Sequence, residues 1–97
     1  MARILVRVEL HGPTTPQHYE RLDAQMAAAG FSRTVISGNA SEYWLPNATY
    51  SSERYRTEGA ARDVAWVAAN GVARSYAVIA TCGTSAWRGL FEAQTAA

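Results

Sequence analysis

The N-terminal segment alternates hydrophobic and polar residues in the manner of a β-strand. Within residues 3–11, hydrophobic side chains recur at every second position on one side, namely Ile4, Val6, Val8 and Leu10. A period of two predicts a strand with one side buried. The other side carries Leu5, Arg7, Glu9 and His11. A cation, a carboxylate and an imidazole are therefore expected in a row on the exposed face of a sheet.

Two segments predict helices that are capped at both ends. The first begins at Thr15 and Pro16, an N-cap followed by proline at the first helical position, and ends at Gly30, which suits a left-handed C-cap. Its hydrophobic residues recur at helical spacing, at Tyr19, Leu22, Met26 and Ala29. The second runs from a cap at Thr57 through Asn70 to Gly71. Its expected buried face comprises Ala60, Ala61, Val64, Val67 and Ala68.

The middle of the chain predicts a hairpin followed by a loop. Residues 31–36 and 42–45 are short β-prone runs, and residues 37–40 between them are typical of a turn. Pro46 is expected at a strand end or a sheet edge, because it cannot donate to a ladder. Val35 and Ile36 are adjacent, so the pattern leaves open which side of the hairpin is buried. Residues 47–57 predict a polar, tyrosine-bearing loop, and residues 75–82 a last strand.

The resulting order β-α-β-β-α-β predicts an α+β fold, a ferredoxin-like sandwich. It would have a four-stranded antiparallel sheet with both helices on one face, formed by a domain of residues 1–82. Residues 83–97 would be a C-terminal tail that packs partly, through Trp87, Leu90 and Phe91. Helices on one face leave the other face and two edges open, so a homodimer is expected.

Composition narrows the functional classes. The formal net charge is +1, too small for a general attraction to nucleic acid or membranes. All nine cationic residues are arginine, which suits phosphate contacts, although a GC-rich genome explains the same composition. Cys82 is the single cysteine, so neither an internal disulfide nor a thiolate metal cluster is expected. With no long apolar run and no signal-peptide pattern, we expect a cytoplasmic protein without a membrane segment, a metal or a cofactor.

The row on the first strand is the candidate site. Arg7, Glu9 and His11 are spaced so that neighbouring side chains lie about 7 Å apart. Arg7 would bind a phosphate, with Arg33 as its companion from a neighbouring strand, while Glu9 and His11 would carry out general acid–base catalysis. A solvated sheet face with an Arg–Glu cross-strand pair explains the same pattern. Arg74, at the start of a strand, is expected to cap nearby carbonyl groups.

Three segments carry a resemblance to a known family: Arg-Val-Glu-Leu-His-Gly, Gly-Phe-Ser-Arg-Thr and Tyr-Trp-Leu-Pro-Asn-Ala-Thr-Tyr. Together they resemble the small bacterial proteins of the GhoS type, over roughly residues 2–80. These are grouped with the type V antitoxin, which is similar to CRISPR-associated endoribonucleases of ferredoxin-like fold. The resemblance implies that fold and cleavage of a toxin's messenger RNA. Where those endoribonucleases would have a metal-binding aspartate, this chain has Glu9 and His11, which favours chemistry without a metal.

Two functions of different class follow. One is an antitoxin-type, metal-independent endoribonuclease acting on single-stranded RNA. It would use Glu9 and His11 for catalysis, and Arg7 and Arg33 for substrate binding. The other is a non-catalytic binding or inhibitor protein, encoded by a mobile element, that acts on a protein partner through the exposed sheet face or an edge strand.

Overall fold

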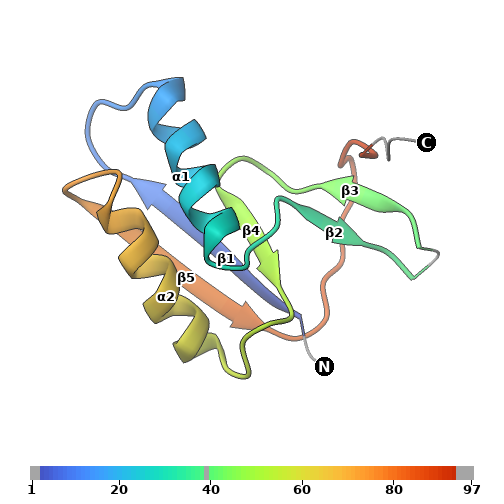
Figure 1. Ribbon diagram of the computed structural model, residues 1–97. Coiled ribbons are helices and arrows are strands. Elements are labelled where there is room, and N and C mark those ends of the chain that lie inside the picture. The colour runs from blue at the N-terminus through green and yellow to red at the C-terminus, as the bar shows by residue number, and fades with distance from the viewer. Residues whose placement is uncertain (1–2, 39, 94–97) are drawn as a thin grey trace.

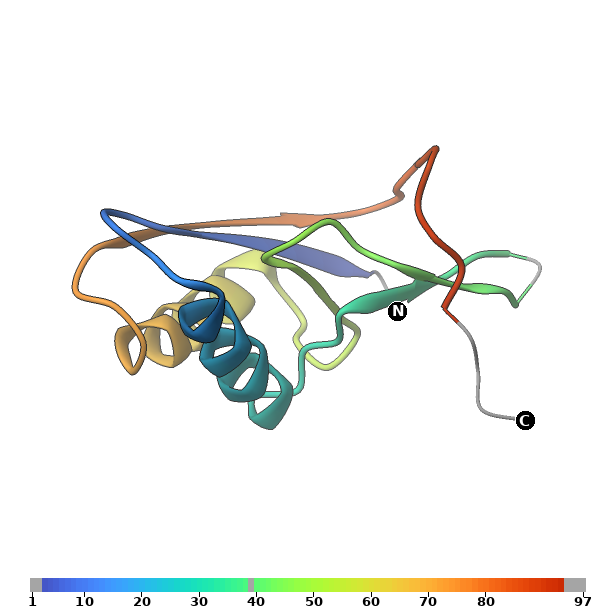
Figure 2. The same cartoon turned by 90° about the horizontal axis from the view of Figure 1, so that it is seen from above.

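The computed structural model describes residues 3–38 and 40–93, and the chain forms an α+β structure with two sheets (Figure 1). The elements in chain order are β1 (Ile4–Leu10), α1 (Pro16–Ala28), β2 (Thr34–Ile36), β3 (Glu42–Trp44), β4 (Thr49–Ser52), α2 (Glu58–Asn70) and β5 (Tyr76–Cys82). The larger sheet is antiparallel with the order β4-β1-β5, and β2 pairs with β3 in a separate two-stranded sheet. Both helices cover one face of the larger sheet and leave the opposite face bare (Figure 2).

The prediction for the first strand is confirmed. The hydrophobic side of β1 is buried beneath the helices, and Arg7, Glu9 and His11 are exposed. β1 pairs with β5 along all seven of its residues, but with β4 only from Ile4 to Arg7. One edge of β1 is therefore fully paired, whereas the other loses its partner strand halfway along.

Both helices begin and end where the caps predict. Before α1, the backbone N–H of Thr15 donates to His18 Nδ1 at 2.9 Å. Before α2, the backbone N–H of Ala60 donates to Thr57 Oγ1 at 3.1 Å. Each helix has 13 residues, and within the described ranges no helix is long and apolar enough to cross a membrane.

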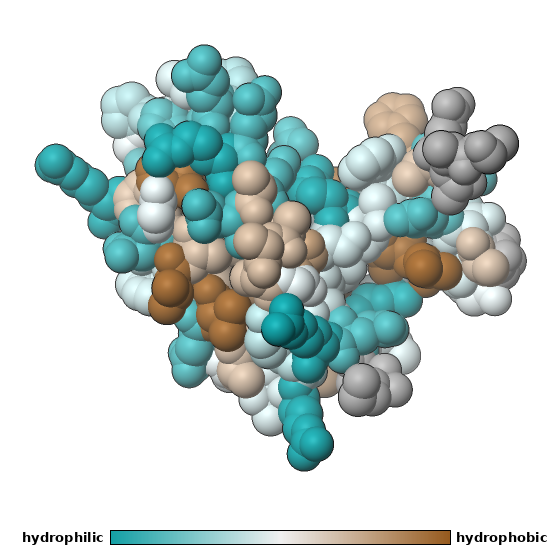
Figure 3. Space-filling model, viewed as in Figure 1, coloured by the Kyte–Doolittle hydropathy of each residue, from teal (hydrophilic) through white to brown (hydrophobic). Residues whose placement is uncertain are grey.

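The buried face of α2 differs from the prediction. Val67 is 72% exposed, Ala60 is exposed as well, and Val64 is only half-buried. The buried face consists of alanines at spacings of three and four, namely Ala61, Ala65, Ala68 and Ala69. Exposed hydrophobic side chains are visible over α2 in Figure 3. Position around the helix decided burial here, because an alanine stripe lets a helix lie close to a sheet, while the larger valines fall outside that stripe.

The predicted four-stranded sheet is wrong, because the strand beside β1 comes from the segment predicted as a loop. After β3 the chain reverses through Ala48, whose φ is +60°, and the N–H of Thr49 donates to the carbonyl of Pro46 at 3.0 Å. β4 then buries Tyr50 completely against the helices. The burial of Ser51 in the same strand is compensated by a hydrogen bond from its hydroxyl to a backbone carbonyl. A strand of tyrosine and serines does not have the hydrophobic alternation that predicts one.

The hairpin of β2 and β3 is confirmed but extends away from the larger sheet (Figure 1). A single bridge between Ser32 and Ser51 joins the stretch before β2 to β4. The structure also decides the open question of its orientation, because Val35 is buried and Ile36 is 56% exposed. Pro46 lies just beyond the end of β3, as predicted.

The C-terminal tail runs along β3. The rings of Trp87 and Tyr43 lie 5.9 Å apart, and the N–H of Trp44 donates to the carbonyl of Phe91 at 2.9 Å. Trp87 and Leu90 are half-buried, but the Phe91 side chain is largely exposed. The tail therefore packs through its backbone and Trp87, and not through Phe91; residues 94–97 lie outside the described residues.

Candidate functional site

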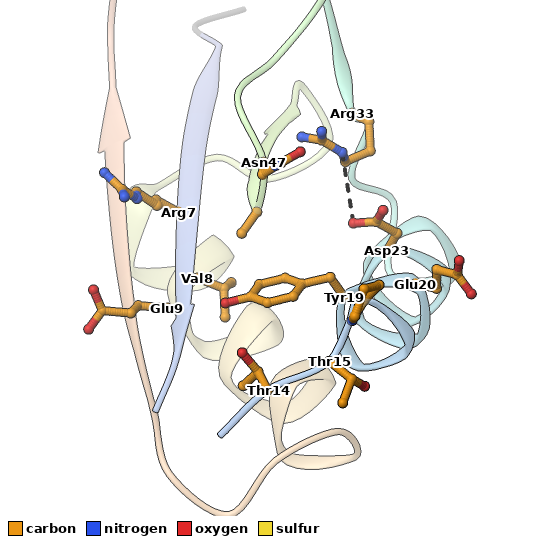
Figure 4. Close-up of a pocket in the computed structure, with 12 residues that line it drawn as sticks. Arg7, Val8, Glu9, Thr14, Thr15, Tyr19, Glu20, Asp23, Arg33 and Asn47 are labelled. Carbon is orange, nitrogen blue, oxygen red and sulfur yellow. Dashed lines mark ion pairs between the residues drawn. The ribbon is translucent and has the colours of Figure 1, made fainter. Parts of the chain in front are cut away.

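The structure places the predicted row at the open face of the larger sheet. Glu9 Oε1 lies 3.2 Å from His11 Nε2, and these side chains are 66% and 42% exposed. Figure 4 shows Arg7 and Glu9 extending from the side of β1 opposite to α1. Across the strand pair, Arg7 is opposite Ile79 and Glu9 is opposite Ala77. The row is accessible to a ligand along its whole length.

Ser75 is a second partner of His11 that the sequence did not suggest. Ser75 Oγ lies 2.8 Å from His11 Nδ1, and the backbone N–H of His11 donates to the Ser75 carbonyl at 2.9 Å. An ionised Glu9 only accepts hydrogen bonds, so Nε2 of the neutral ring carries the proton and Nδ1 accepts from the hydroxyl. A hydroxyl, an imidazole and a carboxylate in this order form a proton-transfer series, in which the carboxylate orients the ring and stabilises its charged form.

Arg33 does not join this row. Its guanidinium donates to the carbonyl oxygens of Pro46 at 2.7 Å, Thr49 at 2.6 Å and Leu45 at 3.2 Å. Its Nε also lies 3.8 Å from Asp23 Oδ1. These contacts hold the chain reversal between β3 and β4, on the side of β1 that faces α1 (Figure 4).

A hollow of about 700 Å³ lies between β1, α1 and this reversal (Figure 4). Its lining mixes two arginines with three carboxylates: Arg7, Arg33, Glu9, Glu20 and Asp23. Asp23 accepts a hydrogen bond from the Tyr50 hydroxyl at 2.6 Å as well as pairing with Arg33. Burial, and then the bond to Asp23, raise the pKa of Tyr50, so this phenol stays neutral. We call this hollow the mixed cleft; two of its charged groups, Arg33 and Asp23, are bound to one another.

A smaller hollow, of about 350 Å³, lies where β1 ends and β5 begins. Its lining includes His11, His18 and Arg74 but no carboxylate, and its other members are Pro13, Thr14, Asn70, Gly71, Val72 and Ala73. Arg74 is exposed. Contrary to the expectation that Arg74 caps carbonyl groups, it makes no hydrogen bond or ion pair within residues 3–38 and 40–93. We call this the basic hollow.

Metal binding is the other chemistry for which these residue types are suited. In the part of the chain that the structure describes, no three His, Cys, Asp or Glu side chains gather in a way that could hold a metal ion. Cys82 is exposed and is not in a disulfide. The hydrogen-bonded group of Ser75, His11 and Glu9 is an arrangement suited to proton transfer at the imidazole.

The register of β5 against β1 is what brings the site together. Ser75 and Arg74 come directly before β5, and the pairing of Leu10 with Tyr76 carries them to the end of β1. No local signal in the sequence predicts this register. Comparison with protein-family models, with curated proteins and with solved structures finds no match to this chain.

Proposed function

We propose that this protein is a metal-independent endoribonuclease acting on single-stranded RNA, with His11 as the general base. The observation that carries the proposal is the series of Ser75, His11 and Glu9 at the exposed end of β1. The Ser75 hydroxyl shows that Nδ1 accepts a hydrogen bond from a hydroxyl group, and the ribose 2′-hydroxyl would replace Ser75 as the donor to this nitrogen. Glu9 on the opposite nitrogen would stabilise the imidazolium that forms.

The reaction needs only groups that the chain and the substrate supply. His11 takes the proton of the 2′-hydroxyl, the 2′ oxygen bonds to phosphorus, and the bond from phosphorus to the 5′ oxygen breaks. The leaving 5′ oxygen takes a proton from water, and the imidazolium returns its proton to solvent. The products are a 2′,3′-cyclic phosphate and a 5′-hydroxyl. General-base catalysis of this kind contributes about 10²–10⁴-fold, and Arg7 would bind the RNA backbone further along β1.

The resemblance of the sequence to GhoS-type proteins supports the same assignment. A central β1 flanked by β4 and β5, with both helices on one face, is compatible with a ferredoxin-like arrangement. In an antitoxin, the substrate would be the messenger RNA of a toxin in the cytoplasm.

A second function is favoured by the bare face of the sheet. Ile79 is 62% exposed and, with Arg7, Glu9, Ala77 and Val78, lines a shallow hollow of about 290 Å³. An exposed isoleucine between an arginine and a carboxylate suits contact with a protein surface. Under this alternative the protein binds a partner, or a second copy of itself, without catalysis.

RNA cleavage in the presence of EDTA tests the first function. We expect a 5′-labelled single-stranded RNA containing all four bases to give fragments with 2′,3′-cyclic phosphate ends. His11→Gln should lower the rate by about 10²-fold or more. A DNA oligonucleotide of the same sequence should stay intact, because it lacks the nucleophile.

Arg62→Ala is the matched control, because Arg62 is an exposed residue of α2 and should leave the rate unchanged. Loss of cleavage on adding EDTA, or an unchanged rate in His11→Gln, would refute the proposal. If the wild-type protein cleaves no RNA, the binding function takes its place, and Ile79→Glu should then abolish partner binding or dimerisation in light scattering.

A further inference from the structure

We propose that the basic hollow binds the scissile phosphate of the RNA, with His18 and Arg74 as its ligands. The inference deepens the proposed function and rests on it for the nature of the substrate. The hollow adjoins His11, which is one of its lining residues. Its volume is at the lower end for pockets that hold small ligands, which suits one phosphate with its ribose.

The N-cap of α1 makes His18 a hydrogen-bond donor. The backbone N–H of Thr15 donates to His18 Nδ1 at 2.9 Å, so this nitrogen carries no proton in that arrangement. The proton of the neutral ring is therefore on Nε2, at the opposite edge of the imidazole. Within the described ranges, Nε2 has no partner. The cap thus holds the His18 ring in place and leaves the Nε2–H group free to donate. This suits His18 to bind a phosphate oxygen rather than to accept a proton.

Arg74 supplies the charge. Its guanidinium is exposed and has no carboxylate or carbonyl partner among the described residues, and guanidinium groups bind phosphate through two parallel hydrogen bonds. Arg74 directly precedes Ser75, whose hydroxyl is 2.8 Å from His11 Nδ1. A phosphate bound by Arg74 would therefore lie beside the proposed base.

The C-terminus of α2 lies in the wall of the hollow and works against anion binding. The last carbonyls of a helix carry partial negative charge, and both Asn70 and Gly71 line the hollow. Arg21 offsets this effect, because its guanidinium donates to the Gly71 carbonyl at 3.1 Å. No lining residue is acidic, although Glu9 contacts the lining residue His11 at Nε2. The lining itself, with Arg74 as its charged group, therefore favours an anion.

Arg7 has a different place in this arrangement. It lines the shallow hollow on the open face of the sheet with Glu9, and it does not line the basic hollow. Arg7 would therefore contact a part of the RNA distant from the bond that breaks, while Arg74 takes the role at the scissile phosphate that the sequence suggested for Arg7.

Phosphate binding can be measured without RNA cleavage. We would titrate the intact protein with uridine 3′-monophosphate and follow the histidine side-chain resonances by NMR, with uridine as the ligand that lacks phosphate. We expect saturable shifts of His18 and His11 with the nucleotide and none with uridine. Arg74→Ala should weaken binding about tenfold, whereas Arg62→Ala should bind as the wild type does.

His18→Gln separates binding from helix capping. Glutamine three residues after a threonine N-cap completes a capping box, so the start of α1 should stay intact. We expect an unchanged melting temperature, weaker nucleotide binding and, for RNA cleavage, a raised KM. Unchanged binding in both His18→Gln and Arg74→Ala would overturn the inference, even if RNA is cleaved. Nucleotide binding that both variants weaken would support the phosphate site even if no RNA is cleaved, and only the proposed function would then fail.

Discussion

The mixed cleft and the basic hollow differ more in the state of their charged groups than in their size. The mixed cleft has about twice the volume, 700 Å³ against 350 Å³. Within it, however, Arg33 is bound to three carbonyls and to Asp23, which also accepts from Tyr50. Arg74 in the basic hollow has no such partners within the described ranges. Arg7, which also lines the mixed cleft, has no such partner in the described part of the chain either, but that cleft contains three carboxylates, whereas the lining of the basic hollow contains none. An unpaired arginine in a lining without carboxylates, and not the larger volume, indicates where an anion binds.

The topology explains the difference. The mixed cleft lies where β4 begins, at the point where β1 loses its partner on that edge. There Arg33 binds the carbonyls of the reversal between β3 and β4. The basic hollow lies beside the fully paired edge of β1, where the backbone of His11 continues the ladder to Ser75. The backbone groups on this edge are already hydrogen-bonded within the sheet. The neighbouring side chains are therefore not needed as their partners and can bind a ligand.

The largest effect on stability should come from Arg33→Ala. Losing the charged donor leaves three carbonyls at the reversal without their partner, so we expect the free energy of unfolding to fall by about 2–4 kcal/mol. Urea denaturation measures it. Arg33→Lys should recover only part of the loss, because one ammonium group lacks the planar fork of a guanidinium. A change below about 0.5 kcal/mol, the size of an ordinary surface substitution, would mean that the cleft does not depend on Arg33.

Tyr50→Phe should have a smaller effect that depends on pH. Loss of the hydrogen bond to Asp23 should cost about 1–2 kcal/mol near neutral pH. Because burial and Asp23 raise the pKa of Tyr50, the folded state keeps the phenol proton while the unfolded chain loses it above about pH 10. Stability of the wild type should therefore fall as the pH rises above this value, and part of that fall should be absent in the variant.

Unfolding at pH 8 and pH 11 checks this prediction. Tyr43→Phe is the control, since the hydroxyl of Tyr43 makes no hydrogen bond within the described residues. Equal alkaline loss in wild type and Tyr50→Phe would show that Tyr50 is not responsible for it.

The smallest effect on stability should come from Arg74→Ala. Because Arg74 is exposed and unpaired in the described structure, its replacement should change the free energy of unfolding by no more than about 0.5 kcal/mol. Thermal unfolding of this variant beside Arg33→Ala gives the direct comparison. A loss above about 1 kcal/mol, outside that surface range, would reveal a structural role for Arg74 and remove the distinction between the two hollows.

Much of the fold is determined by the sequence locally. A period of two decides which side of β1 is buried, and the caps at Thr15 and Thr57 decide where the helices begin. Both depend on residues a few positions apart, so the pattern carries the whole signal. For the same reason, the exposure of the row of Arg7, Glu9 and His11 was predictable.

Tertiary structure alone decided the rest. β4 could not be predicted because Tyr50 is buried by its contact with Asp23 and the helices, among serines that carry no hydrophobic pattern. The second partner of His11, Ser75, is 64 positions away, and only the register of β5 against β1 brings them together. That register depends on packing across the whole sheet, which no local pattern of residues records.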